Sequence, residues 1–143
     1  METSVIETVA KYFYFTSLNE QLTFAASFRV LIELKSNGWI EPIHRDRWVT
    51  LLTKWRTKMR KISPRDWAHY PDEKGFVPPD NFNTAAWSKF IASGEPSEVE
   101  AVLLSRILGF TDEEMASGLG VTVGTIRYRV GRGLRHLGGY LES

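Results

Sequence analysis

The last third of the chain carries the pattern that most constrains the fold. Thr111 and Glu114 form a T-x-x-E capping box, in which each side chain satisfies a free backbone N–H, so we expect a helix to begin there. Gly120 is expected to end that helix, because a residue without a side chain adopts the left-handed turn easily. Thr122 can then cap a second helix. A short helix, a glycine turn and a longer helix together predict a helix-turn-helix.

The second of these helices is predicted to have one apolar side. Apolar residues recur along it at spacings of three and four, namely Ile126, Val130, Leu134, Leu137 and Leu141. The shorter helix supplies Met115, Ala116 and Leu119 as its inner face. In a helix-turn-helix the second helix enters the major groove of DNA, so double-stranded DNA is the expected partner.

Residues off the apolar stripe are the candidate DNA contacts: Thr122, Gly124, Thr125, Arg127, Tyr128, Arg129, Arg132 and Arg135. The amino end of the helix can hold a phosphate, and Gly124 allows close approach. Thr125, Arg127 and Tyr128 are expected to reach base edges, arginine being the commonest partner of guanine. The remaining arginines are expected to meet phosphates, which set affinity and register. The alternative is a helical hairpin with a solvated arginine face.

The amino-terminal part, residues 1–63, is predicted to be a small helical domain. Ser17 and Glu20 fit a second capping box, and Gly38 is well placed to end the helix that follows. The apolar face of that helix is predicted to consist of Leu18, Leu22, Ala25, Phe28 and Ile32.

A further helix is predicted over residues 46–62. Its apolar stripe consists of Trp48, Leu52, Trp55, Met59 and Ile62. Another side of it carries Lys54, Lys58 and Lys61, within a segment, residues 44–65, where basic residues far outnumber Asp46. The formal charge of the chain is only +1 because residues 95–115 are acidic. A near-neutral total therefore does not exclude basic surfaces.

Proline marks the middle of the chain. All but one of the six prolines lie in residues 64–96, together with several aromatic residues. We interpret this stretch as an irregular connector that packs on its neighbours, with a short helix near residues 84–92. Residues 97–143 then form the helix-turn-helix domain. Since no segment alternates as a strand would, the predicted fold class is all-α.

Several classes of function are not expected. The absence of cysteine removes disulfides, thiol catalysis and cysteine zinc sites. The three histidines lack companions at metal-ligand spacing, and no nucleotide-binding loop or nucleophile elbow occurs. We therefore expect no enzymatic activity, no cofactor and no metal. No signal-peptide pattern and no long apolar run is found, which favours a cytoplasmic protein without a membrane partner.

The carboxyl-terminal residues also resemble a known family. Residues 98–104, 109–116 and 123–130, with the run Val-Gly-Thr-Ile-Arg-x-Arg followed by Arg132, are similar to region four of bacterial RNA polymerase sigma factors, notably the extracytoplasmic-function type. The resemblance covers residues 95–141. It implies that the recognition helix binds the upstream promoter element. It also implies that the helix around residues 99–108 helps to grip the flap of the polymerase β subunit.

Residues 18–62 resemble sigma region two more weakly. The run Ala-Ala-Ser-Phe-Arg-Val-Leu at residues 25–31 stands where the family has Asp-Leu-Val-Gln-Glu-Phe. In the family, region two melts the promoter and binds the β′ clamp. By this resemblance Lys54, Lys58 and Lys61 are candidates for contact with polymerase or phosphate, the alternative being the charged outer side of a core helix.

Three hypotheses follow from the sequence. The chain is a working alternative sigma factor, or a DNA-binding regulator that keeps region four without promoter melting. In the third, it is an interaction protein that binds polymerase or another regulator without recognising DNA. An anti-sigma or other regulatory protein is a further candidate partner.

Overall fold

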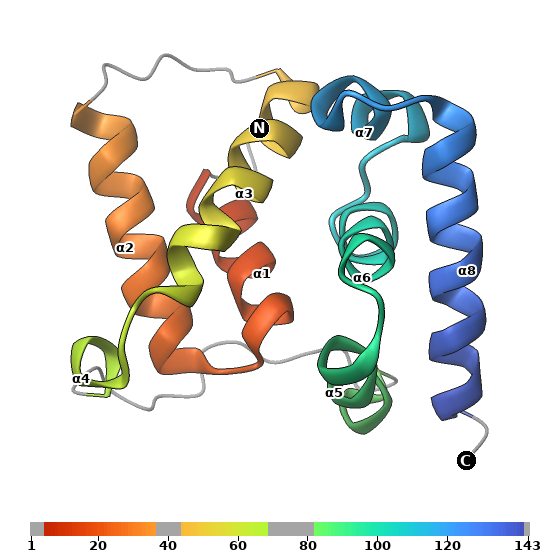
Figure 1. Cartoon of the computed structure of the whole chain (residues 1–143). Helices are drawn as coiled ribbons and strands as arrows, with labels where there is room; N and C mark the ends of the chain where they lie inside the picture. Colours follow the sequence, from red (N-terminus) through yellow and green to blue (C-terminus); the bar gives the residue numbers. More distant parts are fainter. Residues whose placement is uncertain (1–4, 37–43, 69–81, 142–143) are drawn as a thin grey trace. The chain divides into compact units, whose positions relative to one another are not determined.

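The computed structural model describes residues 5–36, 44–68 and 82–141, and within these ranges the regular structure is helical, with no strand (Figure 1). The all-α prediction is confirmed. The chain divides into two compact units, Met1–Phe76 and Val77–Ser143. Their boundary falls inside residues 64–96, of which residues 69–81 lie outside the described ranges, as does the helix end predicted at Gly38.

The first unit contains α1 (Val5–Ser17), α2 (Glu20–Ser36), α3 (Arg45–Arg60) and the short α4 (Pro64–Trp67). α1 packs mainly on α2, and α3 contacts both. The apolar stripe predicted for α3 is confirmed, since all five of its members are buried: Trp48, Leu52, Trp55, Met59 and Ile62. α1, which contacts α3, contributes Val9, Tyr12 and Phe13, which are fully buried. This aromatic cluster is the core of the unit.

The predicted start of α2 is wrong. Ser17 is the last residue of α1, where its hydroxyl donates a hydrogen bond to the carbonyl oxygen of Phe13 at 2.9 Å. The chain then turns at Leu18, whose φ of 54° lies in the left-handed region. Asn19 caps α2, because its Oδ1 accepts from the backbone N–H of Leu22 at 2.9 Å. Asparagine caps a helix as well as serine does, so the local pattern could not choose between them.

The predicted apolar face of α2 is also wrong, except that Ala25 is buried as expected. Phe28 and Ile32 are 56% and 53% exposed, and Phe24 is exposed beside them. The buried side consists instead of Thr23, Ala25, Ala26, Ser27, Val30 and Leu34. Three of these are small, which lets the neighbouring helices approach closely. α2 has two apolar sides, and periodicity alone does not tell which side faces the core.

The second unit contains α5 (Thr84–Ser93), α6 (Pro96–Val102), a π-helical turn (Leu103–Ile107), α7 (Asp112–Leu119) and α8 (Val123–Leu141). The short helix predicted near residues 84–92 is confirmed as α5, which Asn83 caps by accepting from the N–H of Ala86. α8 packs against α5, α6 and α7, so it is the helix around which the unit is built (Figure 1). The core includes Trp87, Phe90 and Leu104.

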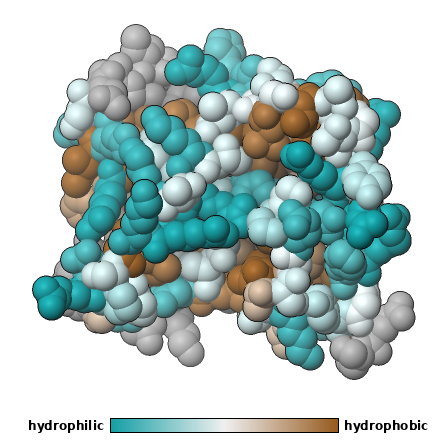
Figure 2. Space-filling model, viewed as in Figure 1, coloured by the Kyte–Doolittle hydropathy of each residue, from teal (hydrophilic) through white to brown (hydrophobic). Residues whose placement is uncertain are grey.

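The surface is mainly hydrophilic with apolar patches between the polar side chains, as Figure 2 shows for one face. Among the side chains that the structure describes, the large apolar ones that remain exposed are Phe24, Phe28, Ile32, Tyr128 and Leu141. Within the described ranges, no helix combines the length and the apolar character needed to cross a membrane.

Candidate nucleic-acid interface

The local signals for the helix-turn-helix are confirmed. Thr111 Oγ1 accepts from the N–H of Glu114 at 3.1 Å, and Glu114 Oε1 accepts from the N–H of Thr111 at 2.9 Å. α7 ends at Gly120, whose φ of 70° is left-handed. A side chain at this position would strain the backbone, so the turn depends on glycine.

The amino end of α8 is fixed by a pair of threonines. Thr122 Oγ1 accepts from the N–H of Thr125 at 3.0 Å, and the two hydroxyl oxygens are 2.9 Å apart. Thr122 and Gly124 are exposed, while Thr125 is partly buried. The first N–H groups of a helix have no partner within the helix, so this exposed end is open to an anion.

The apolar stripe predicted for α8 is right only for its first half. Ile126 and Val130 are buried, whereas Leu134 and Leu137 are partly exposed and Leu141 is exposed.

The buried position farther along α8 is Gly133, where a Cβ would lie 2.5 Å from Cγ2 of Val102 and 3.0 Å from the carbonyl oxygen of Glu98. α8 therefore touches α6 through backbone, at a residue that no apolar pattern would select.

Arg127 projects from the exposed side of α8, with 68% of its side chain accessible. Its Nε donates to Oδ2 of Asp112, the first residue of α7, at 3.1 Å. Tyr128, next to it, is also exposed. These two candidates for base contact are therefore accessible, and one of them is held by the preceding helix.

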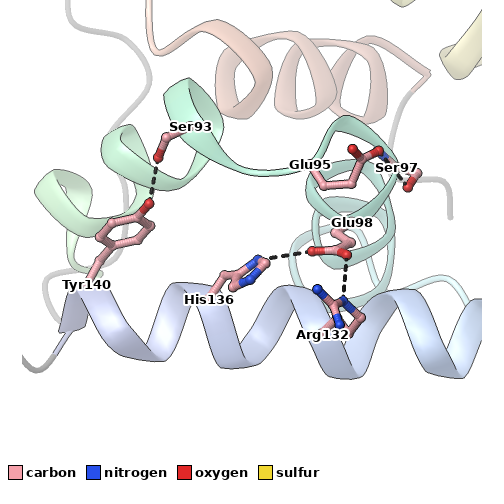
Figure 3. A network of polar contacts seen from close by, with 7 residues as sticks. All are labelled: Ser93, Glu95, Ser97, Glu98, Arg132, His136 and Tyr140. Carbon is pink, nitrogen blue, oxygen red and sulfur yellow. Dashed lines mark hydrogen bonds and ion pairs between the residues drawn. The ribbon is translucent and has the colours of Figure 1, made fainter.

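Arg132 links α8 to α6 (Figure 3). Its Nε donates to Oε2 of Glu98 at 3.1 Å, although the Glu98 side chain is only 8% exposed. Its guanidinium carbon lies 5.7 Å from the centre of the Tyr128 ring. The hydrogen bond to Glu98 raises the pKa of Arg132 above its usual value. A buried carboxylate requires such a partner, so Arg132 has a structural role in addition to the predicted phosphate contact.

His136 is a second residue of α8 that contacts Glu98. Its Nδ1 lies 3.0 Å from Oε1 of Glu98, and the two residues Arg132 and His136 project from α8 four positions apart (Figure 3). One turn further on, the Tyr140 hydroxyl is hydrogen-bonded to that of Ser93 on α5. Sequence reasoning missed Glu98 and His136. The four-residue spacing was visible, but nothing in the sequence connects it with Glu98.

The remaining arginines of α8 are free of ion pairs with described residues. Arg129 is partly buried and Arg135 is exposed. Tyr128, Arg132 and Arg135 follow one another at spacings of four and three, so they share one side of the helix. That side is cationic and accessible.

The three candidate lysines belong to α3 and its end, in the first unit. Lys58 Nζ lies 2.9 Å from Oε1 of Glu33 on α2, which holds the pKa of that carboxyl below its usual value. Lys54 and Lys61 are exposed. Lys58 therefore joins two helices, and the other two lysines remain accessible. In the ranges that the structure covers, no group of histidine and acidic residues could hold a metal ion.

Comparison with known families identifies the second unit. Residues 96–137, from α6 through most of α8, match the family described as sigma-70, region 4. This part of the chain is a sigma-70 region 4 domain. The resemblance drawn from the sequence is therefore confirmed. This match supports a sigma-factor-like role in transcription.

The fold is that of a sigma factor. The chain is similar to the solved structure of the sigma factor RpoE in complex with the anti-sigma factor NepR from Bartonella quintana, with a TM-score of 0.66. The two chains are 19% identical, and the match covers 96% of this chain and 92% of that one. A search of curated protein sequences found no significant match.

Proposed function

We propose that the region 4 domain binds promoter DNA by placing the first half of α8 in the major groove. The observation that carries the proposal is the Thr122-capped α8, set against α7 by the left-handed Gly120, with Arg127 and Tyr128 exposed on its open side. A helix-turn-helix docks on DNA with this part of its second helix.

The side chains of α8 divide into two kinds of contact. Thr125, Arg127 and Tyr128 are proposed to meet base edges, which confer sequence choice. Arg129, Arg132 and Arg135, with the helix end at Thr122 and Gly124, are proposed to meet phosphates, which fix register. Arg132 uses its Nε on Glu98, so its terminal nitrogens would make the phosphate contact.

We propose that the chain also engages RNA polymerase. In the region 4 domain a contact with the β flap would have to use exposed positions of residues 99–108 such as Arg106, because Val99, Leu103 and Leu104 are buried. In the first unit, the exposed Phe24, Phe28 and Ile32 favour a protein partner, since apolar side chains gathered on a surface mark interaction sites. The candidates for this partner are the β′ clamp and a regulatory protein.

Lys54 and Lys61 stay candidates for polymerase or phosphate contact. Their exposure supports the proposal, whereas Lys58 is already paired with Glu33. We further propose that the DNA-binding function resides in residues 97–143, and the polymerase or regulator contact of the first unit in residues 1–63.

Run-off transcription tests the whole proposal. Core polymerase is mixed with this chain as the only specificity factor, on a template carrying a duplex that the chain has selected from a randomised pool. Initiation at one position would establish a working sigma factor. Binding to core and to the selected duplex without a transcript would establish a regulator that has lost promoter melting. Failure to select any duplex would contradict DNA recognition and leave the interaction protein.

A further inference from the structure

The contact between Asp112 and Arg127 joins the two helices of the helix-turn-helix on their exposed side. Arg127 Nε and Asp112 Oδ2 are 3.1 Å apart, and two-thirds of the Asp112 side chain is covered. The two residues are far apart in the sequence, so this contact exists only after the turn has formed. It therefore reports on the assembled motif.

The carboxylate occupies one edge of the guanidinium and leaves another edge open. A guanidinium carries five N–H donors, one on Nε and four on the two terminal nitrogens. Because Asp112 takes the Nε donor, the terminal pair keeps its donors for the two acceptors of a guanine. The contact with Asp112 is thus compatible with a contact to a base edge.

Asp112 is the first residue of α7 and lies within the capping box, between Thr111 and Glu114, where the partial positive charge of the helix end stabilises a carboxylate. An arginine that is already paired with a carboxylate has less side-chain freedom to lose when DNA arrives, so binding restricts it less. The same negative charge repels phosphates that approach Arg127 from this side.

We propose that Asp112 is a specificity-determining residue, which positions Arg127 for a base edge and disfavours its use on phosphates. This inference rests on the proposed DNA recognition by α8. Asp112 acts through Arg127 and need not touch DNA itself.

The test compares Asp112→Asn with Glu113→Gln. Both variants remove one negative charge from the first turn of α7, but Glu113 is exposed and makes no ion pair with a described residue. Each is titrated with a duplex that the wild-type chain selects from a randomised pool and with the unselected pool. Both should bind the pool more tightly, because both lose a charge that repels DNA. Only Asp112→Asn should lower the ratio of the affinity for the selected duplex to the affinity for the unselected pool, by about tenfold.

A double-mutant cycle with Arg127→Ala separates positioning from a merely structural effect. In the Arg127→Ala background, Asp112→Asn should leave the affinity ratio unchanged, because there is no arginine left to position. A further fall in the ratio in that background would overturn the inference. The inference would also be overturned if, with Arg127 present, Asp112→Asn and Glu113→Gln had the same ratio of affinity for the selected duplex to affinity for the unselected pool. If the wild-type chain selects no duplex at all, the proposed DNA recognition fails, and this inference fails with it.

Discussion

Helices α2 and α8 expose opposite kinds of side chain. α8 buries Ile126 and Val130 and exposes cations and a tyrosine, several of which are tied to acids of other helices. α2 buries small side chains and exposes Phe28 and Ile32. A polyanion such as DNA suits the exposed surface of α8. The exposed apolar side chains of α2 are unfavourable in water, and covering them with another apolar surface would lower the free energy. The two units are therefore suited to different partners.

The largest expected effect is on the free energy of unfolding, and it should differ between substitutions on the buried and the exposed side of α2. Leu34→Ala removes a buried side chain and should lower the free energy of unfolding by about 2–5 kcal/mol. Phe28→Ala should change it by less than about 0.5 kcal/mol, because the ring is already half in water. Chemical denaturation measures both. A large loss with Phe28→Ala would mean that the ring is part of the core, and the comparison between α2 and α8 would fail.

The next effect concerns the contact of α8 with α6. Gly133→Val places a side chain against Val102 and the backbone of Glu98, and should destabilise the second unit by about 2–3 kcal/mol. Gly139→Val is the matched control, since a Cβ there would meet no atom of another helix within 4 Å. Thermal unfolding of the two variants should differ clearly. Equal stabilities would show that α8 is free to move away from α6.

The arginines of α8 should separate sequence choice from general attraction to DNA. Arg127→Ala should weaken binding to the selected duplex by about 1–3 kcal/mol, as the loss of one base contact does. Arg135→Ala should weaken selected and unselected duplexes alike and flatten the dependence of affinity on salt.

Titration at several salt concentrations measures these effects. Arg132→Ala should behave as Arg135→Ala does and should also lower the stability of the second unit, because the buried Glu98 loses one of its two partners and keeps only His136. If Arg127→Ala weakened all sequences equally, Arg127 would be a phosphate contact instead.

The smallest effect concerns the first unit and depends on pH. Lys58 holds the pKa of Glu33 below its usual value, so their contact stabilises the fold while Glu33 is ionised and loses that effect as the pH falls through the lowered pKa. Lys58→Ala should cost less than about 1 kcal/mol at neutral pH, and the difference from wild type should vanish in acid. Lys61→Ala, at an exposed position with no ion pair to a described residue, is the control. A difference that persisted in acid would point to packing by the lysine stem instead.

Local signals predicted the helix-turn-helix correctly. The capping box at Thr111, the glycine turn and the Thr122 cap depend on residues within a few positions of one another, so they can be recognised without knowing any tertiary contact. The stripe of α3 was predictable for a related reason, because its other side is too charged to be buried. Where a helix has a single apolar side, its period indicates what it buries.

The predictions failed where two local choices were equally good or where the partner was distant. Asn19 competed with Ser17 as a helix cap, and the two apolar sides of α2 competed for the core. The choice depended on which side could fit closely against its neighbours, and small side chains fit where phenylalanine does not. The same reasoning explains Gly133, where the absence of a side chain allows α6 to pack closely against α8.

The sequence by itself determined the all-α class, the position of the helix-turn-helix and the row of arginines along α8. These follow from capping, periodicity and charge, which are properties of neighbouring residues. Only the tertiary structure decided that Glu98 would hold Arg132, that Asp112 would hold Arg127 and that α2 would leave its aromatic side in water. Those outcomes depend on side chains from different helices meeting at hydrogen-bonding or packing distance, and patterns among neighbouring residues do not reveal that distance.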